Sequence, residues 1–383
     1  MLPEEGHLLP TFKLAKSLES RGHHVRYLVT QRDWDYVSAQ GVECISIPDS
    51  FWLTNGLPGD IGLKGTSLEG IAATNSVIFD RQGEMVQLLK DLRSDLLIVD
   101  PFVPAVAPLA YDSGIPIIFL NVSYDIGVAD LVLGNLLRAG GIASGPPAFL
   151  TKVPELILCP REMEFSNLIK SDRPQYYCEA LVDLDRVERP FSWEGIDQEK
   201  PLIYCAMGSQ AHSFAGSKRF FQTMIDALRT KTEWQMILSV GKYHSTEFEN
   251  VPGNVRVVNW VPQLEVLRRA TLMITHGGMG TIKECIIMGV PMIVFPMVRN
   301  QPMSGARVVY HGLGVRGDIH SVTVEQVQSM IEKIVRDDTY RERVERMGQK
   351  FREMEQSGKG VRIIEKMLEV LQKQRSACRA AAQ

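Results

Sequence analysis

Long apolar runs are absent from this sequence of 383 residues. None approaches the ~20 residues that a membrane-spanning helix requires, so a transmembrane segment is not expected. The first residues have neither a basic region nor an apolar core, which argues against a secretory signal peptide. These absences predict a cytoplasmic protein.

Cysteine is scarce, and neither sign of charge prevails. The six cysteines are scattered without a CxxC pair, and Cys205 and Cys285 lie within apolar runs, which is typical of buried free thiols in a reducing compartment. The formal net charge is -3, from 42 basic and 45 acidic residues, so nucleic acid is not expected as a partner. His23 and His24 have no cysteine or carboxylate at metal-ligand spacing, so no metal site is expected.

What the sequence has is a regular alternation of strand-like and helix-like segments. Residues 24–30 alternate like a strand, residues 84–92 have helical spacing, and short apolar runs follow at 96–99 and 115–120. Alternation of this kind favours the α/β class, with parallel sheets covered by helices on both faces. The second half repeats the scheme, with strands expected at 202–206, 235–240, 255–258, 272–275 and 292–295, and helices at 266–269, 281–288, 324–335 and 361–374.

The length suggests two domains, and a polar stretch at 185–200 separates the two series of elements. A doubly wound domain ordinarily begins with its central strand. Here a loop-like segment, 3–7, comes first, so we expect the first strand of the N-terminal domain to be missing. We predict an N-terminal domain over 1–188, a linker over 189–200, a C-terminal domain over 201–357, and a final helix with a polar tail over 358–383.

The segment richest in chemistry follows the expected strand 272–275. That strand leads into a glycine-rich turn and a helix start at 275–281 (THGGMGT), where backbone can approach a ligand closely and free N–H groups can bind phosphate. Glu284 lies one turn further on and can accept two hydrogen bonds from a ribose diol. Trp260 offers a flat face to a base. Each feature alone is ordinary packing, but the combination in this order predicts a nucleotide-diphosphate site.

The stretch from Trp260 to Gln301 resembles the nucleotide-sugar signature of glycosyltransferase family 1, and the resemblance covers nearly the whole chain. It implies the GT-B architecture, in which two Rossmann-like doubly wound domains face a cleft. The N-terminal domain would bind the acceptor and the C-terminal domain the donor. The resemblance assigns base stacking to Trp260, base or ribose contact to Gln263, diphosphate contacts to His276 and Thr281, the ribose diol to Glu284, and sugar hydroxyls to Gln301.

Further donor-side residues follow from the same resemblance. Ser209 and Gln210 lie in the loop after strand 202–206, which in the family approaches the diphosphate and the sugar. Asn300 stands where many relatives have an acidic residue, which leaves the identity of the sugar open because an amide carries no charge. Three positions within the signature complete the set: Val261, Gly278 and Gly280.

The N-terminal half offers a candidate base. An imidazole such as that of His7 is a natural general base near neutral pH, and Asp100 ends a strand at the edge where open α/β sheets bind ligands. Read alone, His7 is a loop histidine and Asp100 a helix cap before Pro101. The family's His–Asp pair matches both positions, which implies a single displacement with inversion. His276 and helix amides, rather than a metal, would then stabilise the leaving diphosphate.

The acceptor site is less defined. Phe51, Trp52, Phe102 and Asn121 are the candidate acceptor residues, and their apolar character favours a hydrophobic small molecule. The expected donor is a UDP-hexose such as UDP-glucose, with TDP left open, and no cofactor beyond this co-substrate is expected. Two alternatives stay open: a nucleotide-sugar 2-epimerase, for which no clear carboxylate pair is present, and a catalytically inactive binding or partner protein.

Overall fold

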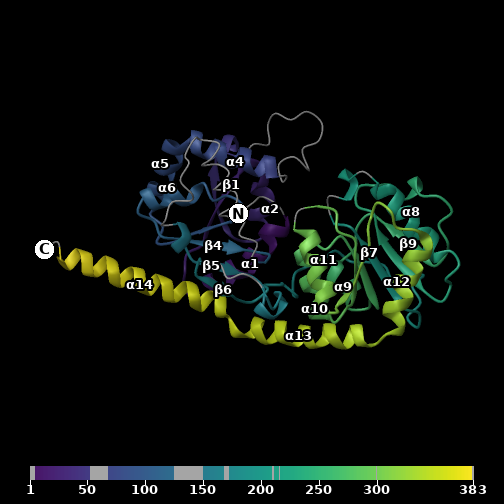
Figure 1. Cartoon of the computed structure of the whole chain (residues 1–383). Helices are drawn as coiled ribbons and strands as arrows, with labels where there is room; N and C mark the ends of the chain where they lie inside the picture. Colours follow the sequence, from purple (N-terminus) through teal and green to yellow (C-terminus); the bar gives the residue numbers. More distant parts are fainter. Residues whose placement is uncertain are drawn as a thin grey trace. The chain divides into compact units, whose positions relative to one another are not determined.

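The computed structural model describes residues 5–51, 68–124, 150–167, 172–208, 211–214, 216–298 and 300–381. The chain forms two compact units, both of α/β type (Figure 1). The first unit comprises Met1–Arg161, Asn167–Leu181 and Met354–Gln383, and the second comprises Glu162–Ser166 and Val182–Glu353. No helix in the described part of the chain is both long and apolar enough to cross a membrane.

The first unit holds two separate parallel sheets. One has the order β1-β2 and the other the order β3-β4-β5-β6. Its strands are β1 (Arg26–Thr30), β2 (Glu43–Ile47), β3 (Leu97–Val99), β4 (Ile117–Asn121), β5 (Glu155–Ile157) and β6 (Gln175–Tyr177). Its helices are α1 (Glu5–Glu19), α2 (Trp34–Ser38), α4 (Leu68–Asp80), α5 (Gln82–Leu92), α6 (Val106–Asp112) and α14 (Lys359–Ala381).

The second unit is built on one parallel sheet with the order β12-β11-β10-β7-β8-β9. A single cluster of buried side chains, including Phe220, Phe221 and Phe295, forms much of its core. Its strands are β7 (Leu202–Ala206), β8 (Gln235–Ser239), β9 (Val255–Val258), β10 (Leu272–Thr275), β11 (Met292–Val294) and β12 (Gly314–Arg316). Its helices are α8 (Ser217–Leu228), α9 (Gln263–Leu267), α10 (Met279–Met288), α11 (Gln301–Tyr310), α12 (Val324–Arg336) and α13 (Thr339–Ser357), whose last turn lies in the first unit.

The predicted linker, residues 189–200, packs on the second unit. The Trp193 indole N–H donates to Glu265 Oε1 at 2.5 Å, and the Arg269 guanidinium lies 3.8 Å from the centre of the Trp193 ring. Arg256 Nη1 also donates to the carbonyl of Ser192 at 2.5 Å. The predicted linker is therefore part of the second unit, which begins at Val182.

The C-terminal helix α14 belongs to the first unit, where it packs against α1. Leu14 and Leu18 of α1 share a core cluster with Val361 and Ile364 of α14. Arg21 pairs with Glu365 through two hydrogen bonds of 2.6 and 2.7 Å. The end of the chain therefore completes the first unit rather than extending the second.

One local prediction is wrong. Gly6 and His7 lie inside helix α1 and not in a loop before it. Pro10 lies within this helix, and its missing N–H leaves only the carbonyl of Gly6 without its intrahelical donor. The helix therefore begins at Glu5, ahead of Pro10, and includes part of the segment that the sequence predicted to be a loop.

Candidate functional site

The turn between β10 and α10 requires glycine at its centre. Gly277 has a φ of 86°, and a Cβ built on it would lie 2.7 Å from Val294 Cγ1. Both the backbone conformation and the neighbouring strand therefore exclude a side chain. The tight turn brings the chain directly from the end of β10 into α10.

His276 is held between two glycines. A Cβ on Gly208, in the turn after β7, would lie 2.7 Å from His276 Cε1. A Cβ on Gly278 would lie 2.7 Å from His276 Nε2. The imidazole thus packs against the backbone after two strands, β7 and β10, which fixes its place at the carboxyl edge of the sheet, where open α/β sheets bind ligands.

Helix α10 presents its N-terminus at this edge. Gly278 is the N-cap, and the first hydrogen bond of the helix runs from the Ile282 N–H to the Gly278 carbonyl at 3.0 Å. The N–H groups of residues 279–281 precede this bond and have no acceptor within the helix. The exposed Gly280 has open space around its Cα, with nothing within 4 Å of a built Cβ. This helix start can accept an anionic group such as phosphate.

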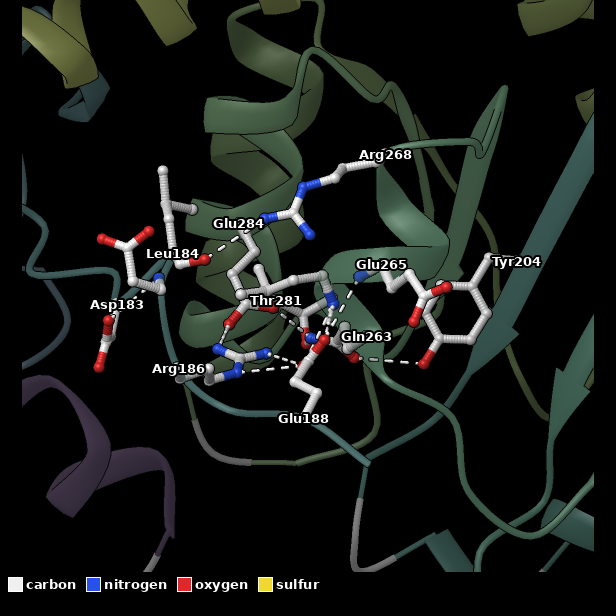
Figure 2. A network of polar contacts seen from close by, with 12 residues as sticks. Asp183, Leu184, Arg186, Glu188, Tyr204, Gln263, Glu265, Arg268, Thr281 and Glu284 are labelled. Atoms are coloured by element: carbon white, nitrogen blue, oxygen red, sulfur yellow. Dashed lines mark hydrogen bonds and ion pairs between the residues drawn. The ribbon is translucent and has the colours of Figure 1, made fainter. Parts of the chain in front are cut away.

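The Glu284 carboxylate lies one turn from that helix start, on the same face as Thr281, and is 6% exposed. Gln263, the first residue of α9, donates to Glu284 Oε2 at 2.5 Å and to Thr281 Oγ1 at 3.3 Å (Figure 2). The Tyr204 hydroxyl in turn donates to Gln263 Oε1 at 3.4 Å, and burial raises the pKa of Tyr204 well above its ordinary value. The three predicted donor residues Gln263, Thr281 and Glu284 therefore form one network.

Arg186 joins this network and was not predicted. Its Nη1 donates to Glu284 Oε1, while Nε and Nη2 donate to Glu188 Oε1 at 3.1 and 3.0 Å (Figure 2). Burial lowers the pKa of Arg186, but the hydrogen bonds and charges of Glu284 and Glu188 outweigh it, so the net pKa lies above the ordinary value. The guanidinium is thus a permanent positive charge beside Glu284.

Glu188 connects the arginine to the start of α9. Its carboxylate accepts hydrogen bonds from the backbone N–H groups of Leu264 and Glu265, at 3.1 and 3.3 Å. A carboxylate at this place satisfies free helix donors and complements the helix dipole. Because Gln263 is the first residue of that helix, the chain Glu188–Arg186–Glu284–Gln263 closes a ring of charge-assisted contacts.

Trp260 follows β9 and is 49% exposed, so one face of the indole is open to a ligand. The Arg189 guanidinium lies 5.8 Å from the ring centre. Its neighbour Val261 is only 3% exposed and belongs to the core. The structure therefore separates the two predicted residues: Trp260 can contact a ligand, and Val261 supports the loop that carries it.

Asn300 and Gln301 begin helix α11. Asn300 is the N-cap, and its carbonyl accepts a hydrogen bond from the Ser304 N–H at 2.9 Å. Gln301 Oε1 accepts from the N–H groups of Met297 and Val298, both at 2.9 Å. The side-chain oxygen of Gln301 thus shapes the loop after β11. Ser209 and Gln210 lie outside the described residues.

In the first unit, the structure brings His7 and Asp100 together. His7 Nδ1 lies 2.9 Å from Asp100 Oδ2, and their side chains are 16% and 1% exposed. Asp100 Oδ1 accepts the Phe102 N–H at 2.9 Å. Burial raises the pKa of the Asp100 carboxyl. The charge and hydrogen bond of His7, with the hydrogen bond from the Phe102 N–H, lower this pKa by more, so the net pKa is below its ordinary value. The ionised carboxylate therefore fixes a proton on His7 Nδ1 and directs Nε2 away from it.

The candidate acceptor residues have different surroundings. Phe102 lies edge-on to the His7 ring, with centroids 5.4 Å apart, and is partly buried. Phe51 is 2% exposed, packs in the core, and carries the Arg81 guanidinium over its ring. Asn121 is 3% exposed and donates to the Tyr124 carbonyl and to Glu155 Oε1. The structure thus places Phe102 beside His7 and the other two residues inside the first unit, while Trp52 lies outside the described residues.

Four of the free cysteines among the described side chains are buried, as predicted. They are Cys159, Cys178, Cys205 and Cys285, and Cys44 is partly buried.

Comparison with known proteins supports the same class. The family model of the erythromycin biosynthesis protein CIII-like C-terminal domain matches residues 223–369. The NDP-glycosyltransferase YjiC of Bacillus subtilis (strain 168) is 27% identical over 374 residues, which cover 92% of this chain and 92% of that protein. Demethyllactenocin mycarosyltransferase of Streptomyces fradiae is 24% identical over 380 residues, which cover 91% of this chain and 81% of that protein.

Solved structures show the same architecture. The glycotransferase of kitacinnamycin superposes with a TM-score of 0.75 at 24% identity, covering 96% of this chain and 97% of that chain. The spinosyn rhamnosyltransferase SpnG complexed with thymidine diphosphate superposes with a TM-score of 0.74 at 19% identity, covering 95% and 98%. The chain is therefore a glycosyltransferase of the GT-B fold. The match to the erythromycin biosynthesis protein CIII-like model lies mostly in the second unit and reaches into α14 of the first, and it is consistent with the resemblance to glycosyltransferase family 1.

Proposed function

We propose that this glycosyltransferase moves a sugar from a nucleoside-diphosphate sugar to a hydroxyl of a hydrophobic small molecule, with inversion and without a metal ion. The donor is a UDP-hexose such as UDP-glucose, and a TDP-sugar is the alternative that a relative complexed with thymidine diphosphate makes relevant. The observation that carries the mechanism is the contact of 2.9 Å between His7 Nδ1 and the buried Asp100 carboxylate. This contact orients the imidazole of His7, whose Nε2 would then take the proton of the acceptor.

The proposed reaction is a single displacement. His7 Nε2 takes the proton of the acceptor hydroxyl as the oxygen forms a bond to the anomeric carbon. The bond from that carbon to the diphosphate oxygen breaks, and its electron pair leaves with the nucleoside diphosphate. Asp100 stabilises the imidazolium that forms, as the carboxylate of a catalytic triad does. Attack opposite the leaving group inverts the configuration.

On the donor side, the α10 start and His276 receive the diphosphate, and Glu284 accepts the ribose diol. A carboxylate has about four lone-pair sites, so Glu284 can hold Arg186, Gln263 and a diol at once. Asn300 and the Nε2 group of Gln301 would contact sugar hydroxyls. A 2-epimerase is not favoured, because it would need a pair of carboxylates at the sugar, and Glu188, the second carboxylate of this network, is already bonded to Arg186 and to the start of α9.

Replacing the exposed indole tests the nucleotide site. Trp260→Ala is expected to weaken UDP binding by roughly 1–3 kcal/mol, because base–aromatic stacking is of that size. Isothermal calorimetry with UDP and TDP measures the change, and Tyr111→Ala, which removes an exposed aromatic ring from the first unit, is the control. A folded Trp260→Ala protein with parental affinity would rule out stacking.

Removing the unpredicted arginine tests the network. Arg186→Leu is expected to weaken UDP binding, though by less than Glu284→Ala, because Arg186 orients the carboxylate and Glu284 makes the contact. Arg229→Leu breaks an exposed pair with Asp226 on α8 and should leave the affinity unchanged. If Arg186→Leu instead bound UDP more tightly than the parent, Arg186 would compete with the ribose rather than position its partner.

Chelation tests the proposed metal independence. Because helix amides and His276 are proposed to stabilise the leaving diphosphate, the turnover number should stay unchanged in excess EDTA. The measurement is the initial rate of nucleoside diphosphate release before and after chelation. Activity that disappears in EDTA and returns with magnesium or manganese would overturn this part of the mechanism.

A further inference from the structure

A short segment of the second unit, residues 188–194, is fastened to the elements around it near both of its ends. At one end, the Glu188 carboxylate accepts two backbone N–H groups at the start of α9. Near the other end, the Trp193 indole N–H donates to Glu265 Oε1 at 2.5 Å. The backbone between these two anchors, which includes Arg189, is therefore held in place on the second unit.

The guanidinium of Arg189 is unpaired, although the backbone that carries it is fixed. It has no hydrogen-bond or ion-pair partner among the residues that the structure describes, and the side chain is exposed. The contact that it does make is with Trp260, whose ring centre lies 5.8 Å from the guanidinium carbon. Arg186, three residues earlier, is by contrast bonded to two carboxylates. The structure thus places a free cation over the indole that is proposed to stack on the base.

The distance between Arg189 and Trp260 is longer than that of a direct stack. In the same segment, Trp193 carries the Arg269 guanidinium 3.8 Å from its ring centre, which is an ordinary contact distance. The separation of 5.8 Å is near the outer limit of a cation–π contact, ~6 Å. A flat base between the two groups would need about 7–8 Å, twice the contact distance of carbon atoms. A movement of about 2 Å by one exposed, flexible side chain would therefore admit a base.

We propose that Arg189 and Trp260 form a clamp on the nucleobase of the donor, with the indole on one face of the base and the guanidinium on the other. This inference rests on the proposed function, in which Trp260 stacks on the base. A guanidinium suits this task because it is planar, is weakly hydrated for a cation, and stacks on aromatic rings and on nucleobases. The clamp contacts the faces of the base and not its edges, so it accepts uracil and thymine alike.

The clamp is continuous with the contacts at the ribose end of the site. Glu188, the residue directly before Arg189, accepts hydrogen bonds from Arg186, and Arg186 donates to Glu284 (Figure 2). Two arginines of one short segment thus have separate tasks. Arg186 positions the carboxylate that is proposed to bind the ribose, and Arg189 covers the base.

The test compares the affinities of the full chain for UDP and for uridine, which has the base and the ribose but no phosphate. Calorimetry measures UDP binding, and ligand-observed NMR titration measures uridine binding. The variants are Arg189→Leu, Arg189→Lys, Trp260→Ala, and Arg189→Leu combined with Trp260→Ala. The matched control is Arg336→Leu, which removes an arginine from the second unit whose side chain is 79% exposed.

Arg189→Leu is expected to weaken the binding of UDP and of uridine by the same factor, about 3- to 30-fold, which is the range of a cation–π contact. Arg189→Lys should lose less, because it keeps the charge but not the planar group. Arg189→Leu should also weaken UDP binding in the Trp260→Ala background, since the guanidinium contacts the base directly. The control should bind UDP as the parent does.

Parental UDP affinity in folded Arg189→Leu would overturn the clamp, and a loss in Trp260→Ala would show that the donor site itself stands. A loss for UDP without a loss for uridine would also overturn it, because the arginine would then contact the diphosphate. A third contrary result is no effect of Arg189→Leu in the Trp260→Ala background, because the arginine would then only support the indole. A parent that bound neither UDP nor TDP would refute the proposed function, and the clamp with it.

Discussion

His7→Ala is expected to lower turnover by about 10²–10⁴-fold, the usual contribution of general base catalysis. Asp100→Asn should lose as much or less, because Asp100 acts only through the imidazole that it holds at 2.9 Å. The turnover of the double variant should be close to that of His7→Ala, and well above the value expected if the two losses multiplied. Residues that act as a unit do not have additive effects.

The assay needs an aliphatic alcohol as acceptor, because an acidic phenol is already deprotonated and would hide the loss of the base. UDP affinity should stay within a few-fold of the parent in all three variants, because the proposed nucleotide contacts lie in the second unit. His24→Ala removes an exposed histidine that pairs with Glu43 and is the matched control. Near-parental turnover in folded His7→Ala would refute the mechanism but not the fold.

The acid side of the pH profile gives an independent readout of the same pair. Because the net pKa of Asp100 is below its ordinary value, this carboxylate stays ionised as pH falls through the range in which an imidazole gains its proton. Loss of kcat/KM at low pH should therefore not come from protonation of Asp100 at or above the ordinary pKa of an aspartic acid, and an acid limb in that range that disappears in Asp100→Asn would contradict this.

Arg307→Met is expected to lower the free energy of unfolding by about 3–5 kcal/mol, the usual result of leaving a buried partner charge uncompensated. Arg307 is 0% exposed, its Nε donates to Glu164 Oε2 at 3.0 Å, and its guanidinium lies 4.5 Å from the centre of the Phe165 ring. The pair fastens the segment Glu162–Ser166 to helix α11, whose first residue is Gln301.

Denaturant unfolding measures this effect, and the double variant Arg307→Met with Glu164→Leu is the control. Replacing both charges by apolar groups of similar size should recover most of the lost stability, because the cost comes from the unpaired charge rather than from the lost attraction. A single variant within 1 kcal/mol of the parent, or a double variant less stable than Arg307→Met, would contradict this account.

Much of the fold could be predicted because buried parallel strands appear as short apolar runs. The predicted strands 202–206, 255–258 and 272–275 coincide with β7, β9 and β10. Strands β5, β6 and β12 were not predicted, because three residues, some of them charged or polar, do not establish a period. Helix α13 was also not predicted, although Tyr340, Val344, Met347 and Phe351 are spaced for one buried helical face.

The candidate site was likewise predicted only in part. Apart from Ser209 and Gln210, the predicted donor residues are close in sequence, within 260–301, so their order is itself a motif. Arg186 lies 98 residues from Glu284, and an arginine in a polar segment carries no signal of its partner. His7 and Asp100 are 93 residues apart, and the family resemblance, rather than their spacing, led to the pair. The helical position of His7 was missed because the segment 3–7 was predicted to be a loop.

Nucleoside diphosphate release tests the central claim most directly. The protein is incubated with a panel of UDP-sugars and TDP-sugars, with and without a hydrophobic aliphatic alcohol, and free nucleotide is quantified over time. We predict release from at least one donor, faster with the alcohol, with a glycoside formed in equal amount, and little release in Glu284→Ala. If no donor gave nucleotide above the protein-free rate while UDP and TDP still bound, the protein would be a binding protein rather than a sugar-transferring enzyme.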